Sequence, residues 1–365
     1  MKVLAFMNAY SQGSSGGDVV FAQTVRQLTD IEWHIVTSHE GKLFCQKNDV
    51  QAHYIITSRE KVFRHVILTY VRRIFTALRY HFTGTYDCVY STSDALPDVI
   101  PAWFLAQTKH LPWIARTYHV VPSNRIISRS TQEISFQLMK LYAKSIITAS
   151  SQMKTALMKR GIEKQKIRIV FPPIEKKQFN TKKAPSYDAV WMARIHPSKG
   201  VSDLLRIWKQ VVKTHPKRTL AIIGTGERQY IDELEKSISD EKLNDSVNYL
   251  GYQSDEKAFG MIAASSLFLH TSHEEGFGLT IGEVLLCGTP VLSYDLPVFR
   301  EVYSPVLRVS PQGNIDIFAK RVISMLQNPL KEKKRVADNI PQELQHTCEK
   351  ARKEEEQIIY EATHV

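Results

Sequence analysis

Short apolar runs alternate with longer stretches of helical periodicity along the first half of this chain. The periodicity predicts a first long helix at 18–29, and the apolar runs predict strands at 3–8, 33–38, 54–57, 88–91, 113–118, 146–149 and 167–171. Strands that alternate with helices are typical of a parallel sheet covered by helices on both faces. The first half therefore predicts one doubly wound α/β unit.

The same alternation restarts after a polar, basic stretch at 176–185, which we interpret as a linker. The second half predicts strands at 189–192, 220–223, 247–250, 267–270 and 291–293, with helices at 201–212, 229–238, 257–264 and 315–326. A charged helix is expected from 342 to about 361. A chain of 365 residues is long for one core. We therefore expect domains at 1–178 and 179–345 and a terminal helix at 346–365, which we expect to pack back toward the first domain.

The most informative stretch is 272–292, where a glycine-rich polar loop leads into a predicted helix. Gly276 and Gly278 allow a ligand to approach the backbone closely. The amides of 277–279 lie where a helix N-terminus offers unpaired donors and partial positive charge, which suits an anion. Two carboxylates, Glu275 and Glu283, lie beside this junction and can bind hydroxyls. A phosphorylated sugar has both kinds of group.

The net charge of +11 is carried by one half of the chain. Residues 1–180 hold 24 Lys and Arg against 12 Asp and Glu, whereas the remaining residues hold 24 against 25. Such an asymmetry points to an anionic partner for the first half, such as lipid headgroups, a phosphorylated acceptor or nucleic acid. A merely basic soluble surface remains an alternative.

Composition and motifs argue against several other classes of protein. The four cysteines, at 45, 88, 287 and 348, form no Cys-x-x-Cys pair, so neither zinc nor a disulfide framework is expected. No apolar run approaches the roughly 20 residues of a membrane span, and no secretory signal is recognised. We expect a cytoplasmic protein. No nucleic-acid module appears, and aromatic residues do not interleave with basic ones, so no nucleic-acid partner is expected.

The ordered motifs of this chain resemble those of GT-B-fold glycosyltransferases, and most closely glycosyltransferase family 4. The most specific motif is Glu-x7-Glu, from Glu275 to Glu283, followed by Gly-Thr-Pro-Val at 288–291. Weaker motifs occur in the family's order: Gly16 and Gly17, Arg194, Lys199 with Gly200, 224–226, and 264–265. The resemblance implies two Rossmann-like doubly wound domains that face a central cleft. Ala193 and the loop at 295–301 depart from the family's pattern.

The resemblance also implies a retaining transferase that takes a hexose-type sugar from a nucleoside-diphosphate sugar. The acceptor would be a lipid-linked, glycan or small molecule, attacking on the face that the diphosphate leaves. No two aspartates lie two positions apart, so the Asp-x-Asp metal motif is absent. The sequence therefore predicts no metal and no other cofactor. The positive charge that stabilises the diphosphate would come from Arg194, Lys199 and the amides of Phe277, Gly278 and Leu279.

The resemblance assigns roles to the two acidic residues. By resemblance, Glu275 binds the sugar hydroxyls or stabilises the charged transition state, and Glu283 binds the ribose hydroxyls of the nucleotide. Glu283 has a structural alternative, because Thr280-Ile281-Gly282-Glu283 is also a capping box, in which the glutamate folds back onto the start of the helix.

Three further positions match the family more weakly. His119 follows a predicted strand and is similar to the family's cleft histidine, which contacts the donor sugar. Gly16 and Gly17 either approach the diphosphate or form a simple strand-to-helix turn. Tyr252 and Gln253 lie where the family reads the nucleobase.

An amphipathic helix is predicted at 61–82. Its apolar stripe is Phe63, Val66, Ile67, Tyr70, Ile74 and Leu78, and its basic residues include Lys61, Arg64, Arg72 and Arg79. Two interpretations stay open: the stripe packs on the sheet, or the helix lies on an anionic membrane surface. The second would make the protein a peripheral protein on the cytoplasmic face of a membrane.

Two functions other than transfer also stay open. A glycoside hydrolase would use Glu275 and Glu283 as its acid and base, although a neutral leaving group does not require Arg194 and Lys199. A nonenzymatic protein that binds nucleotide-sugars or nucleic acid would use the same cations without catalysis.

Overall fold

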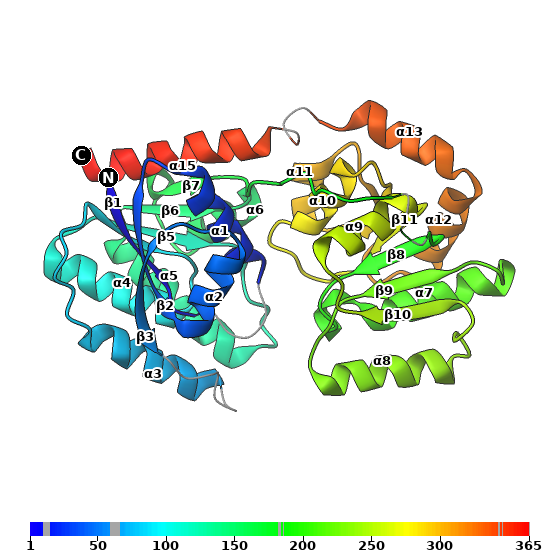
Figure 1. Cartoon of the computed structure of the whole chain (residues 1–365), viewed down its shortest axis with the longest axis horizontal. Coiled ribbons are helices and arrows are strands. Elements are labelled where there is room, and N and C mark those ends of the chain that lie inside the picture. The colour runs from blue at the N-terminus through cyan, green and yellow to red at the C-terminus, as the bar shows by residue number, and fades with distance from the viewer. Residues whose placement is uncertain are drawn as a thin grey trace. The chain divides into compact units, whose positions relative to one another are not determined.

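The computed structural model describes residues 1–9, 15–58, 66–181, 184, 186–341, 344 and 346–364. These residues form two compact units, Met1–Pro173 with Thr347–Val365, and Ile174–His346. The first unit contains β1 Lys2–Met7, α1 Gly16–Gln27, β2 Glu32–Ser38, α2 His39–Lys47, β3 His53–Ser58, α3 Val66–Arg79, β4 Cys88–Ser91, α4 Leu96–Lys109, β5 Trp113–Thr117, α5 Ile126–Tyr142, β6 Ser145–Thr148, α6 Ser151–Met158, η1 Lys164–Lys166, β7 Ile167–Ile169 and α15 Thr347–His364. The second contains β8 Ala189–Met192, η2 Pro197–Lys199, α7 Val201–Thr214, β9 Leu220–Ile223, α8 Arg228–Asp240, β10 Val247–Gly251, α9 Asp255–Ala264, β11 Leu267–His270, α10 Leu279–Leu286, β12 Val291–Tyr294, α11 Pro297–Tyr303, β13 Arg308–Ser310, α12 Ile315–Gln327 and α13 Pro329–Asn339 (Figure 1).

The first unit is built on a parallel seven-stranded sheet in the order β3-β2-β1-β4-β5-β6-β7. Alternate residues of β1 enter different cores: Val3 and Ala5 pack in one cluster, and Leu4 and Phe6 pack in another. Because both faces of the sheet are covered, the strand is a continuous apolar run. This explains why the apolar runs predicted the strands of this unit so well.

The second unit is built on a parallel six-stranded sheet in the order β10-β9-β8-β11-β12-β13. The predicted α/β class with two doubly wound sheets is confirmed. The sequence reasoning missed β13, because Arg308–Ser310 has three residues and no apolar run. The sheet order places β8 directly beside β11. The loops that follow these two strands therefore share the carboxyl edge of the sheet, where ligands bind in such folds.

The helix α15 belongs to the first unit although it ends the chain. It contacts α1, β4 and β5, and Figure 1 shows it running across the top of the first unit. Ile358 and Ile359 are buried in the same cluster as α1 and β1. Glu355 is also buried, at 1% exposure, and requires a partner there.

The predicted amphipathic helix is described only in part. The described part, α3, covers 66–79, and Lys61, Phe63 and Arg64 lie outside the described residues. The buried side chains of α3 are Thr69, Arg73 and Ala77. Val66 and Ile67, which belong to the predicted apolar stripe, are 50% and 58% exposed. The apolar stripe of this helix therefore lies partly in solvent.

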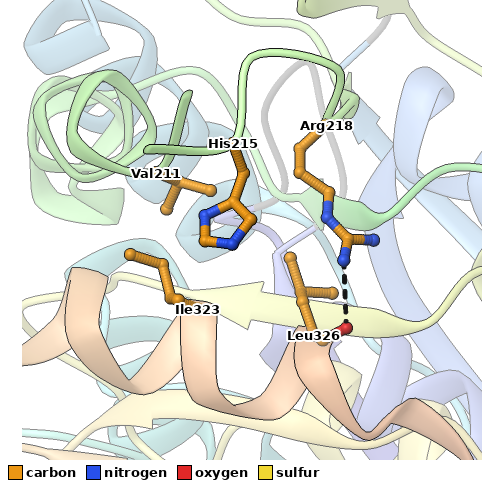
Figure 2. Close-up of a pocket in the computed structure, with 5 residues that line it drawn as sticks. All are labelled: Val211, His215, Arg218, Ile323 and Leu326. Carbon is orange, nitrogen blue, oxygen red and sulfur yellow. Dashed lines mark hydrogen bonds between the residues drawn. The ribbon is translucent and has the colours of Figure 1, made fainter. Parts of the chain in front are cut away.

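A shallow hollow lies where the end of α7 meets α12. Figure 2 shows its lining: Val211, His215, Arg218, Ile323 and Leu326. The Arg218 guanidinium donates a hydrogen bond of 3.2 Å to the Leu326 carbonyl, which satisfies an acceptor at the C-terminal end of α12. None of the residues predicted for the site lines this hollow. The Arg218 contact joins the segment after α7 to the end of α12.

Candidate functional site

The structure brings Lys199 and Glu275 together at the carboxyl edge of the second sheet. The Lys199 Nζ lies 2.6 Å from the Glu275 Oε1. The loop after β8 is tied to the loop after β11, because the Thr271 hydroxyl donates to the Gly200 carbonyl at 2.9 Å. Gly200 has a φ of 67°, and a Cβ there would lie 2.0 Å from the Thr271 carbonyl oxygen. Only glycine allows this close approach, so the two predicted residues meet because of local backbone packing.

The Glu275 carboxylate is stabilised in its ionised form. Burial raises the pKa of Glu275, but the ammonium of Lys199 and the imidazole of His270 lower it by more, so its pKa lies well below the ordinary value. The side chains of Lys199 and Glu275 are 21% and 15% exposed. A carboxylate that remains reachable from solvent and ionised can accept hydrogen bonds from hydroxyl groups.

Arg194 lies in the loop between β8 and η2, where its side chain is exposed. No hydrogen bond or ion pair to another described residue holds its guanidinium. Gly224 and Gly226 pack closely against this loop. A Cβ at Gly224 would lie 1.9 Å from the Ala193 carbonyl oxygen, and a Cβ at Gly226 would lie 2.1 Å from the Ile195 carbonyl oxygen. The guanidinium is thus an available cation on a closely packed loop.

The helix α10 begins at Leu279, with Gly278 as its N-cap. Gly278 has a φ of 83°, and a Cβ there would lie 2.6 Å from the Phe299 ring. The Gly278 carbonyl accepts a hydrogen bond of 2.8 Å from the Tyr303 hydroxyl. The amides of Gly278 and Leu279 have no hydrogen-bond acceptor among the described residues. The predicted N-terminus for anion binding is therefore present in this loop, with Phe277 buried beside it.

Glu283 does not form the capping box that the sequence offered as an alternative. Thr280 lies inside α10, and no side chain caps this helix. Instead, the Glu283 carboxylate lies 3.0 Å from the Lys177 Nζ. Lys177 also lies 3.1 Å from the Asp255 carboxylate. Burial raises the pKa of Glu283 in spite of Lys177, so its charge depends on that ammonium.

Tyr252 follows β10, and its side chain is 66% exposed. A ring with this exposure is available for stacking on a planar ligand. The neighbouring Gln253 side chain donates a hydrogen bond of 2.8 Å to the Leu250 carbonyl, which holds the turn. The structure thus places Tyr252 at the carboxyl end of its strand, on the same edge as the other predicted residues of this unit.

The remaining predicted residues belong to the first unit. Gly16 and Gly17 open α1, which is capped by Ser15 and Asp18 in a capping box. The Tyr118 hydroxyl donates a hydrogen bond of 3.1 Å to the Gly17 carbonyl, and a Cβ on Gly17 would lie 2.7 Å from the Tyr118 ring. Gly17 is therefore required for this contact.

His119 follows Tyr118 and β5, with an exposed side chain. Its carbonyl accepts a hydrogen bond of 2.8 Å from the Gln132 side chain. The imidazole has no hydrogen-bond or ion-pair partner in the part of the chain that the structure describes. Because it follows β5, it lies at the carboxyl edge of the first sheet.

Sequence reasoning missed two residues of the second unit's site. His270 ends β11 and lies 3.4 Å from the Glu275 carboxylate. Its position at a strand end was a signal that could have identified it, because strand ends line this edge. Lys177 lies in the stretch interpreted as a linker, and only the folded chain brings it to Glu283.

Comparison with known proteins finds similarities for the second unit. Residues 174–343 match the model of the family "Glycosyl transferases group 1". The chain is 26% identical to O-antigen chain mannosyltransferase B of Escherichia coli over 141 residues. This alignment covers 38% of this chain and 37% of that protein. Over 145 residues it is 31% identical to poly(glycerol-phosphate) alpha-glucosyltransferase of Bacillus subtilis, 39% of this chain and 21% of that protein. The matches therefore span less than half of these relatives.

Solved structures match the whole chain. A structure of Anabaena HepE in complex with UDP and glucose has a TM-score of 0.79 and 17% identity, and the match covers 100% of both chains. The fold is therefore GT-B, as the resemblance implied. The activity that the resemblance implied is argued next.

Proposed function

We propose that this protein, whose residues 174–343 form a glycosyl transferases group 1 domain, is a retaining glycosyltransferase. It transfers a hexose-type sugar from a nucleoside-diphosphate sugar to a glycan, lipid-linked or small-molecule acceptor, without a metal ion. The observation that carries this proposal is the pairing of Lys199 with Glu275 beside the N-terminus of α10. The ammonium and the helix N-terminus can bind an anion, and the carboxylate can bind hydroxyl groups.

The chemistry follows from what the leaving group requires. When the bond between the anomeric carbon and the diphosphate breaks, negative charge grows on the diphosphate. Arg194, Lys199 and the free amides at Gly278 and Leu279 are the groups that would stabilise this charge. The acceptor oxygen bonds to the anomeric carbon on the same face, and its proton passes to the departing diphosphate oxygen. Glu275 would bind the sugar hydroxyls during this step.

The nucleotide is expected to lie along the second unit. Glu283 would accept the ribose hydroxyls, and Tyr252 would stack on the base. The Anabaena HepE structure contains UDP and glucose, and this supports a UDP-sugar as the first donor to test. In the first unit, His119 would contact the donor sugar.

Metal independence rests on the side chains available. Among the described residues, the group of His, Cys, Asp and Glu residues compact enough to hold a metal is Glu32, His34 and His53. Glu32 and His53 begin β2 and β3. They therefore lie at the amino ends of these strands, at the opposite edge of the sheet from His119. The positive charge for the diphosphate is thus assigned to Arg194 and Lys199.

The test is a thermal-shift panel of UDP, GDP, ADP and their common sugars, measured in EDTA. One nucleotide should stabilise the wild-type protein strongly, by several degrees at saturation. Equal stabilisation of the Arg194→Ala and Lys199→Ala variants would reject the proposed diphosphate site. The anomeric configuration of the product, read by NMR, decides between retention and inversion.

A glycoside hydrolase is the second candidate, because the two glutamates differ in pKa. The pKa of Glu275 is lowered and that of Glu283 is raised, which is a pattern that an acid and base pair uses. Arg194 and Lys199 favour the transferase, since a neutral leaving group needs no cation. Release of free sugar from an uncharged glycoside, without an acceptor, would support the hydrolase.

We also propose that the layer α3–α5 of the first unit binds an anionic membrane surface. Its exposed apolar side chains are Val66, Ile67, Leu68, Val71, Phe75, Phe104, Ile126, Ile127, Ile134 and Leu141. Arg72, Arg79 and Lys109 are exposed on the same helices. The acidic residues of these helices are Asp98, which is buried, and Glu133, which pairs with Arg160. Apolar area with net positive charge suits a peripheral contact with anionic lipid.

This contact would be peripheral, because no helix in the described part of the chain could span a bilayer. It would bring the protein to lipid-linked acceptors. The test is flotation with vesicles that contain anionic lipid.

A further inference from the structure

The imidazole of His270 is enclosed at the end of β11. The side chain is buried, with 5% of the residue exposed. Its Nε2 lies 3.4 Å from the Glu275 Oε1, and its Nδ1 lies 3.3 Å from the Ser293 hydroxyl on β12. The Phe299 ring of α11 packs edge-on against it, with ring centroids 5.5 Å apart. Three different elements therefore determine where this ring points.

The partners of the ring also determine where its proton lies. The Glu275 carboxylate is ionised, because Lys199 and His270 hold its pKa well below the ordinary value, and an ionised carboxylate only accepts hydrogen bonds. A proton on Nε2 makes this 3.4 Å contact favourable, whereas an unprotonated Nε2 would turn its lone pair toward the carboxylate. Nδ1 faces the Ser293 hydroxyl, whose single proton can be donated either to Nδ1 or to the Tyr294 carbonyl 3.0 Å away, so either state of Nδ1 fits. The geometry thus favours a proton on Nε2.

The contacts of Lys199 and His270 with Glu275 converge on one carboxylate oxygen. The Lys199 Nζ and the His270 Nε2 lie 2.6 and 3.4 Å from Oε1. No group in the described part of the chain binds Oε2, and the side chain keeps 15% exposure. A carboxylate held by one oxygen cannot rotate freely, so the direction of its second oxygen is defined as well.

We propose that His270 is a positioning residue: with Lys199 it holds the Oε1 of Glu275, so that Oε2 is presented as the acceptor for a donor-sugar hydroxyl. The proposal rests on the proposed function for its ligand. Among the described residues, the charged and titratable groups that act on this carboxylate include Lys199, His270 and Tyr303. Tyr303 is buried, which raises its pKa far above neutrality, so it stays uncharged.

The first test needs no substrate. Glutamate with a 13C-labelled carboxyl group reports the titration of Glu275, and the Glu275→Gln variant identifies its signal. In the wild type this signal should titrate well below 4.5, the ordinary pKa. The His270→Leu variant should titrate at higher pH, and His270→Gln, which keeps a donor, should stay nearer the wild type. An unchanged midpoint in His270→Leu would overturn the proposal.

A measurement on the wild type alone covers the case in which His270→Leu does not fold. The 15N shifts of the labelled imidazole report which nitrogen carries the proton. A protonated Nε2 near neutral pH agrees with the proposal, and an unprotonated Nε2 contradicts it.

The second test measures turnover with UDP-glucose as the probe, followed by UDP release. His270→Leu should lower kcat about tenfold, because it removes a polar contact with a charged group. The KM for UDP-glucose should change little, because the diphosphate contacts remain, and His270→Gln should recover part of kcat. A rise in KM alone would contradict a positioning role. If UDP-glucose neither binds nor reacts while the NMR results hold, the proposed donor fails and the geometry of Glu275 stands.

Discussion

The carboxylate of Glu355 on α15 accepts a hydrogen bond of 2.7 Å from the guanidinium of Arg116 on β5, in the interior of the first unit. Both side chains are 2% exposed. The Tyr90 hydroxyl donates to the same carboxylate at 2.6 Å, and the Thr24 hydroxyl donates at 3.1 Å. The last helix of the chain is thus joined to the first unit by a buried polar network in addition to its apolar face.

The Glu355→Ala variant should therefore destabilise the first unit. It leaves the Arg116 charge buried without its partner, which costs about 3–5 kcal/mol in buried pairs. Urea unfolding followed by circular dichroism measures this loss. The variant Glu361→Ala on the same helix is the control, because Glu361 pairs with Arg168 at the surface and should lose less than about 1 kcal/mol. Equal losses in both variants would contradict the role of the buried pair.

Removing either cation of the proposed diphosphate site should weaken nucleotide binding. Arg194→Ala and Lys199→Ala should each lose about 1.5–3 kcal/mol of binding free energy, the contribution of a hydrogen bond to a charged group. Calorimetry with the nucleotide that stabilises the wild type measures the change. The matched control is Lys236→Ala, which removes an exposed cation of α8. A loss as large in this control would show a general charge effect.

Removing Lys177 should change how stability depends on pH. Burial already raises the pKa of Glu283, so folding favours its protonated form and stability falls as the pH rises from the unfolded pKa through the folded one. In Lys177→Met this fall should be larger and should extend to higher pH, by about 3 kcal/mol at neutral pH.

Free energies of unfolding between about pH 4 and pH 8 test this prediction. The double variant Lys177→Met with Glu283→Gln carries no charge at either position of this pair. It should recover most of the stability that the single variant loses at neutral pH. If the single and double variants show the same pH dependence, the Lys177–Glu283 pair does not carry the effect.

Two glycines with the same backbone conformation should respond differently to alanine. Gly200 and Gly288 have φ values of 67° and 79°, but a Cβ at Gly200 would lie 2.0 Å from the Thr271 carbonyl, whereas nothing lies within 4 Å at Gly288. Gly288→Ala should lose only about 1–2 kcal/mol, for the left-handed conformation. Gly200→Ala should lose more, and it should weaken nucleotide binding because the Lys199 loop moves. Equal effects on nucleotide binding would argue against the loop contact.

Membrane binding should depend on the exposed apolar face of α3. Ile67→Asp and Phe75→Asp change side chains that are 58% and 57% exposed, so they should fold normally and reduce flotation with anionic vesicles. Leu330→Asp on α13 is the control, since Leu330 is 81% exposed outside this layer. Arg73 is fully buried, so a substitution there would test folding instead. Unchanged flotation in both α3 variants would remove the membrane proposal.

The pairing of Lys199 with Glu275 shows how far sequence reasoning reaches in this site. Both residues follow predicted parallel strands, and parallel strands bring their carboxyl ends to one edge. The contact could therefore be expected in general terms. Glu283 was different, because its local sequence fitted a capping box equally well. The helix begins at Leu279 instead, and the contact with Lys177 was not encoded in any local pattern.

The linear pattern of residues was sufficient for the α/β class, the order of most strands and helices, and the glycine-rich junction before α10. These features depend on the periodicity of apolar residues and on local backbone preferences, which neighbours in the chain express directly. Folding alone decided that His270 meets Glu275, that Lys177 meets Glu283 and that Glu355 meets Arg116. Each contact joins residues that lie on separate elements, and burial makes the partner of a polar group depend on the whole packed structure.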